Sequence, residues 1–135
     1  MSADYPSMTT AEIRSKFLNF FEERGLKLYP SSSLVPDDPS LLLANAGMNQ
    51  FKEYYQGKKT MKEIGAISCQ KCVRTNDIDC IGEDGRHLSF FEMLGDFSFG
   101  GVSKQQACAW AFELITKEFK LPLDRLYFTL SLIHI

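Results

Sequence analysis

Two strand-like segments joined by a long polar connection place the strongest constraint on the fold of this chain. Between residues 88 and 99, apolar residues recur at every second position, which is the spacing of side chains on one face of a β-strand. Residues 64–74 also have the pattern of a strand. Structureless connections as long as residues 75–89 are uncommon and usually functional. We therefore predict a long β-hairpin whose loop contributes to a functional site.

The two faces of the second strand differ in composition. The first face is almost entirely apolar and is expected to pack on the core; it comprises Phe91, Met93, Gly95, Phe97 and Phe99. The second face is mixed and is expected to line a solvated cleft; it comprises Phe90, Glu92, Leu94, Asp96 and Ser98. Because Arg74 ends the first strand, we expect it near Phe90 at the mouth of the hairpin.

Two helices are indicated by capping boxes that precede apolar stripes with helical spacing. Thr9 and Glu12 form the first box, and its stripe comprises Ile13, Phe17, Phe20 and Phe21. Ser103 and Gln106 form the second box, and that helix is expected to run to about Lys120. Its stripe comprises Ala107, Trp110, Ala111, Leu114, Ile115 and Phe119.

Shorter segments complete the prediction. Residues 26–29 are expected to be extended, residues 41–44 to form a short strand, residues 48–55 a short helix, and residues 126–135 a last strand. No linker or internal repeat is visible, so we predict one domain of the α+β class, with a mostly antiparallel sheet flanked by helices. A terminal strand with no turn after it is typical of a cut chain, and we expect residues 1–135 to be a single partial domain.

Composition and charge exclude several classes of protein. With 44% hydrophobic and 24% charged residues, the chain has the composition of a globular protein rather than a disordered one. A formal net charge of -2 argues against a wholly basic nucleic-acid binder. No apolar run approaches the roughly 20 residues that span a bilayer, and the start of the chain is unlike an export signal. Its cysteines are therefore expected to be reduced thiols in a cytoplasmic protein without a membrane partner.

A small zinc site is one interpretation of the cysteines. Cys69 and Cys72 form a C-x-x-C pair, with Cys80 and His87 as candidate third and fourth ligands. A single C-x-x-C pair is a weak indication of a metal, and Cys80 and His87 do not form a matching second pair. We therefore interpret Cys69 and Cys72 as reduced thiols on a half-buried strand and predict no metal held by the cysteines.

A more informative group surrounds the predicted hairpin: Arg74, Arg86, His87, Phe90 and Glu92. The guanidinium group of an arginine is a planar, permanently charged fork that suits a phosphate. Two further donors on the loop, Arg86 and His87, suit additional phosphates. A phenyl ring and a carboxylate on one face of a strand, as at Phe90 and Glu92, suit a purine with an exocyclic amine. The pattern favours a nucleotide site.

The residues alone leave two other interpretations open. In the first, the hairpin is ordinary surface structure, with Arg74 paired to Asp77 or Asp79 and the phenylalanines in the core. In the second, residues 52–74 contact RNA phosphates, because this segment holds six basic residues and two acids. Four acids follow in residues 75–84, which makes a solvated, charge-balanced surface the better explanation of the basic segment.

Three stretches of the sequence resemble the N-terminal catalytic region of the bacterial alanyl-tRNA synthetase family, within the class II aminoacyl-tRNA synthetases. They are SSSLVPDDPSLLLANAGMNQFK, CQKCVRTNDID and GRHLSFFEMLGDFSFG. The resemblance extends from Thr10 to about Thr129, and the NAGMNQF and FFEMLG strings make it highly specific. It implies an antiparallel sheet flanked by helices, with motif 1 in the first helix and residues 26–46, and motif 2, which holds ATP, in residues 72–99.

The resemblance also implies site residues and a reaction. Arg74 would be the catalytic arginine on the α-phosphate of ATP. The remaining implied contacts are Arg86 and His87 at the outer phosphates, Phe90 against adenine, and Glu92 and Met93 on the adenine and amino-acid side. The carboxylate of L-alanine would attack ATP to give alanyl-adenylate, and the alanyl group would pass to tRNA(Ala). Arginines and Mg²⁺ would supply the charge neutralisation.

The chain also departs from the family pattern. Leu26 stands where a histidine is usual, Asp96 stands where an asparagine is usual, and the ending SLIHI replaces an acidic stretch. Motif 3, the tRNA-recognising helices, the zinc-bearing editing domain and the C-terminal domain fall outside the sequence. We therefore expect a fragment of an alanine–tRNA ligase that is inactive alone. The alternative is a truncated, non-catalytic paralogue that binds ATP or RNA.

Overall fold

A three-stranded sheet organises the chain, and the computed structural model describes residues 7–76 and 78–129. The strands lie in the order β1 (Lys27–Leu28), β2 (Gly65–Val73) and β3 (Phe90–Ser98). β2 and β3 form the predicted antiparallel hairpin, whereas β1 pairs with β2 in parallel, so the sheet is mixed. The predicted α+β class is confirmed, and the antiparallel hairpin makes up most of the sheet.

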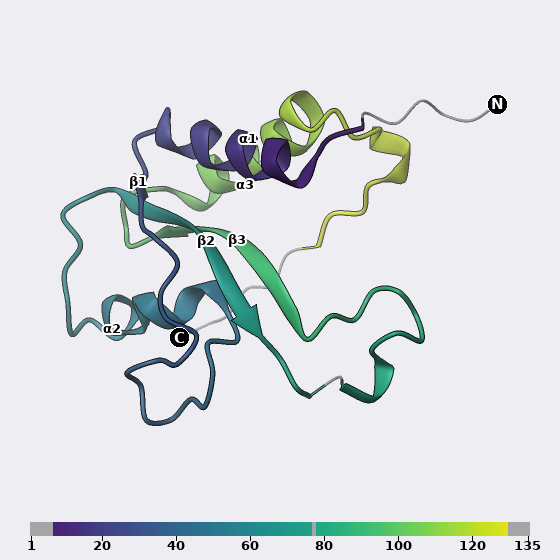
Figure 1. Cartoon of the computed structure of the whole chain (residues 1–135). Helices are drawn as coiled ribbons and strands as arrows, with labels where there is room; N and C mark the ends of the chain where they lie inside the picture. Colours follow the sequence, from purple (N-terminus) through teal and green to yellow (C-terminus); the bar gives the residue numbers. More distant parts are fainter. Residues whose placement is uncertain (1–6, 77, 130–135) are drawn as a thin grey trace.

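Helices cover both faces of this sheet (Figure 1). α1 (Thr10–Glu22) and α3 (Lys104–Glu113) lie on one face. A 3₁₀ helix, η1 (Gly47–Phe51), continues into α2 (Lys52–Tyr55) on the other face. The three predicted helices are thus confirmed. The first part of the second helix is a 3₁₀ helix, and the third helix ends in a π-helical turn, Leu114–Glu118.

The ends of α1 follow directly from its sequence. Thr9 is the N-cap: its Oγ1 accepts from the amide of Glu12 at 3.2 Å, and the Glu12 carboxylate accepts from the amide of Thr9 at 2.7 Å. Gly25 ends the helix with a φ of +88°, which favours glycine. The core formed by α1 comprises Phe17, Phe20, Phe21, Leu26, Ile67 and Leu114. Leu26, a departure from the family pattern, is therefore a core residue.

The register of the hairpin decides which side chains share a face. Cys72 is directly opposite Phe91, and opposed residues in antiparallel strands point to the same side of the sheet. Leu94, which belongs to the mixed face of β3, packs against the core formed by α1. The prediction of a solvated cleft along this face is met only in part, because helices cover its middle at Leu94. Phe90, Glu92 and Asp96 remain exposed on this face.

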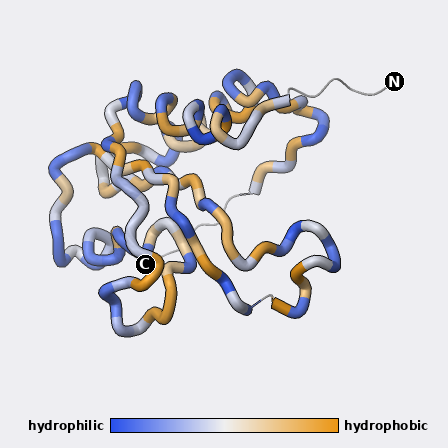
Figure 2. The backbone as a smooth tube through the Cα atoms, viewed as in Figure 1, coloured by the Kyte–Doolittle hydropathy of each residue, from blue (hydrophilic) through white to orange (hydrophobic). Residues whose placement is uncertain are grey.

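The apolar face of β3 packs against η1 and α2 through an aromatic cluster. Phe51 is only 1% exposed, and its ring centre lies 4.8 Å from that of Phe97 and 6.0 Å from that of Phe99. Gly47 permits this approach, since a Cβ atom there would lie 3.2 Å from the ring of Phe97. Figure 2 shows apolar positions recurring along the hairpin and along the helices that cover it. The expectation that this face packs on the core is met at Phe97 and Phe99, which contact the buried Phe51, whereas the core around α1 lies on the other face.

Residues 41–44 do not form the predicted strand. The amide of Leu41 donates to the carbonyl of Asp38 at 3.0 Å, so the chain is still turning where the strand was expected to begin. Only Ala44 reaches the sheet, where its carbonyl accepts from the amide of Val73 at 2.9 Å. A short apolar run does not by itself distinguish a strand from a loop that touches a sheet once.

The last helix and the segment after it are covered only in part. Leu114 is buried and Trp110 packs on the core, whereas Ala107 and Ala111, predicted to be buried, are exposed because α1 covers only the later part of this helix. Residues 126–129 pair with no described strand, and the rest of the predicted last strand lies outside the described residues. None of the described helices is long and apolar enough to cross a membrane.

Lys120 offers a test of the C-terminal end of this helical segment. Its φ of +53° lies in the left-handed region, which costs a residue other than glycine about 1 kcal/mol. We expect Lys120→Gly to raise the free energy of unfolding by about 1 kcal/mol in urea denaturation. The matched control, Lys117→Gly within the π-helical turn, should lower it by about 1 kcal/mol. Destabilisation by both variants would contradict the left-handed conformation.

Candidate functional site

Arg74 is held at the end of β2 by three contacts. Its amide donates to the carbonyl of Ser89 across the mouth of the hairpin at 2.9 Å, and its Nε donates to the carbonyl of Asn45 at 3.0 Å. Its guanidinium carbon lies 5.3 Å from the centre of the Phe91 ring, within the range of a cation–π contact. The side chain is exposed, and it makes no ion pair with any residue that the structure describes. The Nη atoms are therefore available to an external anion.

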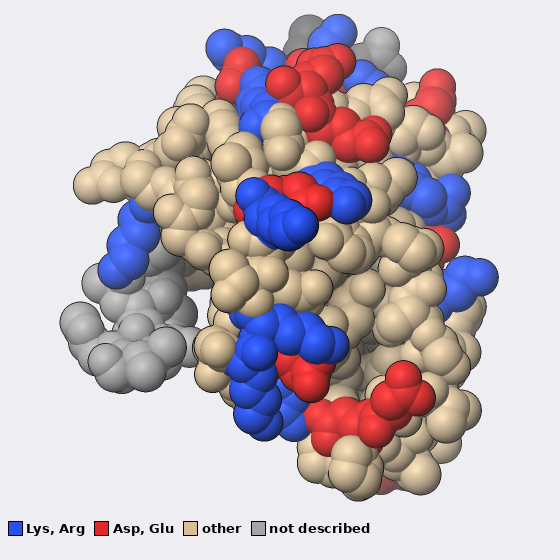
Figure 3. Space-filling model, turned by 90° about the vertical axis from the view of Figure 1, so that its left-hand side faces the viewer, with Lys and Arg blue, Asp and Glu red and all other residues tan. Residues whose placement is uncertain are grey.

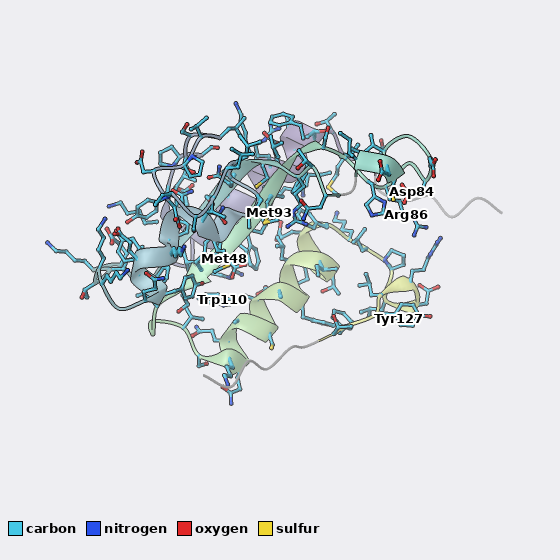
Figure 4. All side chains as sticks on the ribbon, turned by 90° about the horizontal axis from the view of Figure 1, so that it is seen from below. Met48, Asp84, Arg86, Met93, Trp110 and Tyr127 are labelled. Carbon is cyan, nitrogen blue, oxygen red and sulfur yellow. The ribbon has the colours of Figure 1, made fainter. Side chains whose placement is uncertain are left out.

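Two methionines lie on the same side of the sheet as Arg74. Figure 4 shows Met48 and Met93 close together, one from η1 and one from β3. The Sδ atom of Met93 accepts a hydrogen bond from the amide of Gly47 at 3.2 Å, which joins the two elements. We call this region the Arg74 surface; it comprises Asn45, Met48, Arg74, Phe91 and Met93.

A buried glutamine in β2 holds the segments that border the Arg74 surface in place. Gln70 is 1% exposed, and its Oε1 accepts from the amide of Ser32 at 2.9 Å and from Nε2 of Gln50 at 3.0 Å. Its Nε2 donates to the carbonyl of Lys71 at 2.8 Å and to that of Ser32 at 3.3 Å. Because both ends of the amide are satisfied, this network ties η1 and the chain after β1 firmly to β2.

Phe90 and Glu92 lie on the opposite face of the hairpin. Glu92 Oε2 accepts from Nη2 of Arg14 on α1 at 2.6 Å and from its Nε at 3.1 Å. This hydrogen bonding lowers the pKa of the Glu92 carboxyl and raises the pKa of Arg14. The structure therefore separates these two residues from Arg74. The phenyl ring beside the guanidinium is that of Phe91, where the sequence suggested Phe90.

The loop residues Arg86 and His87 lie away from the Arg74 surface. Figure 4 shows Arg86 beside Asp84 at the far end of the hairpin, remote from the two labelled methionines. Asp84 Oδ1 accepts from the amides of Arg86 at 2.8 Å and His87 at 3.0 Å, and its Oδ2 lies 2.5 Å from Nδ1 of His87. These two amides and the imidazole lower the pKa of Asp84 to about 2. One carboxylate thus organises the hairpin tip.

The geometry gives little support to two other interpretations of the hairpin residues, an ion pair of Arg74 with an aspartate and a zinc site at the cysteines. Asp79 makes no ion pair with Arg74, and Asp77 lies outside the described residues. Cys69 and Cys72 are three positions apart in β2 and project from opposite faces, so their thiols do not converge on one ion. In the two described ranges, no group of three or more histidine, cysteine, aspartate or glutamate side chains could hold a metal.

Two of the six basic residues in residues 52–74, Lys52 and Lys59, form ion pairs with described acids. Lys52 donates to Asp38 at 2.5 Å, and this hydrogen bond holds the pKa of the Asp38 carboxyl well below its usual range. Lys59 pairs with Glu53. Figure 3 shows basic and acidic groups interleaved on one face of the molecule. This arrangement favours a solvated surface over a continuous RNA-binding stripe.

Sequence reasoning missed three residues that shape the site. Phe91 was assigned to the core because the alternation shows which residues share a face, not which face meets a ligand. Asn45 acts through its main-chain carbonyl, for which the only signal was its place in the NAGMNQF string. Asp84 counted only as one of several loop acids, although an aspartate two residues before an arginine is well placed to bind the following amides.

Comparisons with known proteins bear on this geometry. The family model described as tRNA synthetases class II (A) matches residues 12–133. The alanine–tRNA ligase of Synechocystis sp. is 52% identical over 126 residues, which cover 93% of this chain and 14% of that protein. The chloroplastic/mitochondrial alanine–tRNA ligase of Sorghum bicolor is 56% identical over 115 residues, 85% of this chain and 12% of that protein. The alanine–tRNA ligase of Pseudothermotoga lettingae is 52% identical over 122 residues, 90% of this chain and 14% of that protein. The chain thus spans 12–14% of the length of these relatives.

Proposed function

Because the chain belongs to the class II (A) family of tRNA synthetases, we propose that it forms the first part of the catalytic domain of an alanine–tRNA ligase. In this proposal the Arg74 surface binds ATP. The observation that carries the proposal is the guanidinium group of Arg74, which is held by Asn45 and Phe91 while its Nη atoms stay open to a phosphate. The matched range, residues 12–133, includes every residue of this surface.

The proposed reaction needs alignment and positive charge more than it needs a general base. The carboxylate of L-alanine attacks the α-phosphorus of ATP, releasing pyrophosphate and forming alanyl-adenylate, and the alanyl group then passes to tRNA(Ala). Both reactants of the first step are anionic, so a cation fixed beside the α-phosphate stabilises the transition state. The Arg74 surface fits this requirement, since it offers a guanidinium and no carboxylate. Mg²⁺ bound to the phosphate oxygens of ATP would supply further positive charge.

The two contacts on Arg74 set the direction in which it can bind. With Nε occupied by the Asn45 carbonyl, the donors that remain are the N–H groups of Nη1 and Nη2. Two such groups side by side match two oxygens of one phosphate. A donor that is already oriented loses little freedom on binding, which is the condition for effective electrostatic stabilisation.

We assign the adenine ring to Phe91 rather than to Phe90. Phe91 lies against the guanidinium of Arg74, whereas Phe90 projects from the face that the α1 helix covers. Met93 and Met48 border the same surface and would line the adenine and amino-acid side. Glu92, bound to Arg14, acts in this proposal as an anchor for α1 and not as a contact to the base.

Arg86 and His87 would meet the outer phosphates only after the hairpin tip moves toward the Arg74 surface. The tip is exposed and lies away from that surface in the structure. Loops that close over a bound substrate commonly bring such contacts into place. We propose that this tip does so when ATP is present.

The methionines provide a direct test of where ATP binds. In a chain labelled with methyl-¹³C methionine, added ATP should shift the signals of Met48 and Met93, because both border the Arg74 surface. Met61, on the connection before β2, is the internal control and should not move. Arg74→Ala should remove the shifts. Shifts confined to Met61 would place ATP elsewhere and contradict the proposal.

The two neighbouring phenylalanines provide a matched pair. Phe91→Leu should weaken ATP binding about tenfold, because a base stacked on an aromatic ring gains about 1–3 kcal/mol. Phe90→Leu, on the opposite face, should change the affinity by less than about twofold. The dissociation constants of ATP for both variants come from the same titration of the methionine methyl signals. A larger loss at Phe90 would restore the original assignment of adenine to that ring.

The catalytic part of the proposal is tested in a longer protein. Residues 7–129 can replace the matching part of the Synechocystis alanine–tRNA ligase, which is 52% identical. We expect this chimera to catalyse alanine-dependent ATP–pyrophosphate exchange, and the 135-residue chain alone to show none above a blank. ATP binding by the chain together with an inactive chimera would favour the alternative, a non-catalytic nucleotide-binding module. A cytoplasmic location and tRNA(Ala) as a partner belong to the same proposal.

A further inference from the structure

We infer that Asp84 is a positioning residue, whose carboxylate holds the imidazole of His87 with Nδ1 turned inward and Nε2 turned outward toward a phosphate oxygen. The inference rests on the proposed function, because it requires the hairpin tip to meet the outer phosphates of ATP. It concerns a residue that no motif in the sequence singled out.

One carboxylate makes the contacts that shape the tip. Oδ1 accepts from two consecutive amides, those of Arg86 at 2.8 Å and His87 at 3.0 Å, which closes a tight turn. Oδ2 lies 2.5 Å from Nδ1 of His87. The same group therefore fixes both the backbone and the ring of His87, and the direction of the ring is set relative to the turn.

The chemistry of the carboxylate decides which nitrogen carries a proton. The amides of Arg86 and His87, followed by the imidazole, lower the pKa of Asp84 to about 2, so this group is ionised at neutral pH. An ionised carboxylate only accepts hydrogen bonds, and the nitrogen facing it must therefore be Nδ1–H. Nε2 then points away from Asp84. On the protonated ring it is a donor suited to an anionic oxygen.

The surroundings leave Nε2 accessible. The side chain of His87 is 43% exposed and that of Asp84 is 40% exposed, so a ligand can reach the ring from the solvent side. Arg86, whose amide joins the same turn, places a cationic side chain next to it. Two groups that bind phosphate are thus organised by one acid that does not itself need to touch the nucleotide.

Asp84→Asn separates the two tasks of the carboxylate. Asparagine keeps Oδ1, which can still accept hydrogen bonds from both amides. In place of Oδ2 it has Nδ2, which donates hydrogen bonds and cannot accept one from Nδ1–H. In ¹⁵N spectra at pH about 9, where an ordinary imidazole is neutral, we expect the Nδ1–H tautomer in the unsubstituted chain and the Nε2–H tautomer in Asp84→Asn. His87→Gln identifies the signals, since His134 is the other histidine. The same tautomer in both proteins would overturn the inference.

The exchange reaction of the chimera tests the consequence for the nucleotide. We expect His87→Ala to raise the KM for ATP about tenfold, the effect of losing one hydrogen bond to a charged group. Asp84→Asn should raise the KM by about threefold, because a neutral ring that carries its proton on Nε2 still donates, but more weakly than a charged ring. The double variant should be no worse than His87→Ala, because Asp84 acts through His87. If the increases in KM caused by the two substitutions multiplied in the double variant, the inference would be overturned. Glu83→Gln, at the neighbouring acid, is the matched control and should leave the KM unchanged.

The same assay separates this inference from the proposed function. If Arg74→Ala abolishes exchange while Asp84→Asn leaves the KM for ATP unchanged, the inference about Asp84 is wrong and the proposed function stands. If Arg74→Ala leaves exchange intact, or the unsubstituted chimera shows no exchange, the proposed function fails and the inference fails with it.

Discussion

Arg74→Ala should lower alanine-dependent ATP–pyrophosphate exchange in the chimera by about a hundredfold to a thousandfold, the typical cost of removing one preoriented donor from a developing charge. The reason lies in the geometry of the guanidinium, which the Asn45 carbonyl and the Phe91 ring already hold in place. An alanine leaves the α-phosphate without its aligned cation. The rate constant kcat should fall because the contact strengthens in the transition state, and the KM for ATP should rise because the same guanidinium also binds ATP before the reaction, so kcat/KM should fall further than kcat.

Two further variants distinguish alignment from simple charge. Arg74→Lys keeps a cation but lacks Nε and the planar fork, so we expect an intermediate loss. Lys71→Ala removes a cation from the same strand, three positions earlier and on the opposite face, and should leave exchange unchanged. If Lys71→Ala were as harmful as Arg74→Ala, general attraction of the nucleotide by basic residues would explain both results.

Local signals in the sequence predict most of the elements correctly. The Thr9–Glu12 box places the start of α1 because two side chains satisfy free amides within one turn of the chain. The alternation after Leu88 predicts β3 because a strand turns successive side chains to opposite sides. Both rules act over a few residues and need no knowledge of the remainder of the molecule.

The assignment of faces depends on tertiary packing, and here the sequence misleads. Alternation groups Phe90 with Glu92 and Phe91 with Met93, and the register confirms that grouping. It does not reveal that α1 lies on the face of the first pair, where Arg14 binds Glu92, while η1 borders the second. Arg74 follows β2 by one position, and its partner face is fixed by the pairing of Cys72 with Phe91. A shift of one residue in register would have placed it beside Phe90 instead.

Contacts made by the main chain are equally hard to foresee. The carbonyl of Asn45 binds Arg74 from 29 positions earlier in the chain, and any residue could supply such a carbonyl. Its position comes from η1, which the Gln70 network and the Phe51 ring attach to the sheet. Candidate ligands can therefore be proposed from side-chain chemistry, whereas the groups that orient them emerge only from the packing.

Phe51→Ala should lower the free energy of unfolding by about 4 kcal/mol, the largest effect on stability that we expect from a single truncation. Phe51 is 1% exposed, and its ring centre lies within 5.4 Å of both Tyr29 and Phe97. Removing the ring leaves a cavity that the surrounding aromatic side chains fill only in part. The measurement is urea denaturation followed by circular dichroism. Phe112→Ala is the control, since that ring is 46% exposed and should cost less than about 1 kcal/mol.

The same substitution links the core to the site, because Phe51 ends η1 and anchors it to β3. If η1 loosens, the Asn45 carbonyl no longer holds Nε of Arg74, so the guanidinium regains its freedom although Arg74 itself is unchanged. Phe51→Leu, which fills more of the cavity, should keep the chain folded and still broaden the Met48 methyl signal. A sharp, unshifted Met48 signal in folded Phe51→Leu would show that the Gln70 network alone positions η1, and that the aromatic cluster contributes stability without shaping the site.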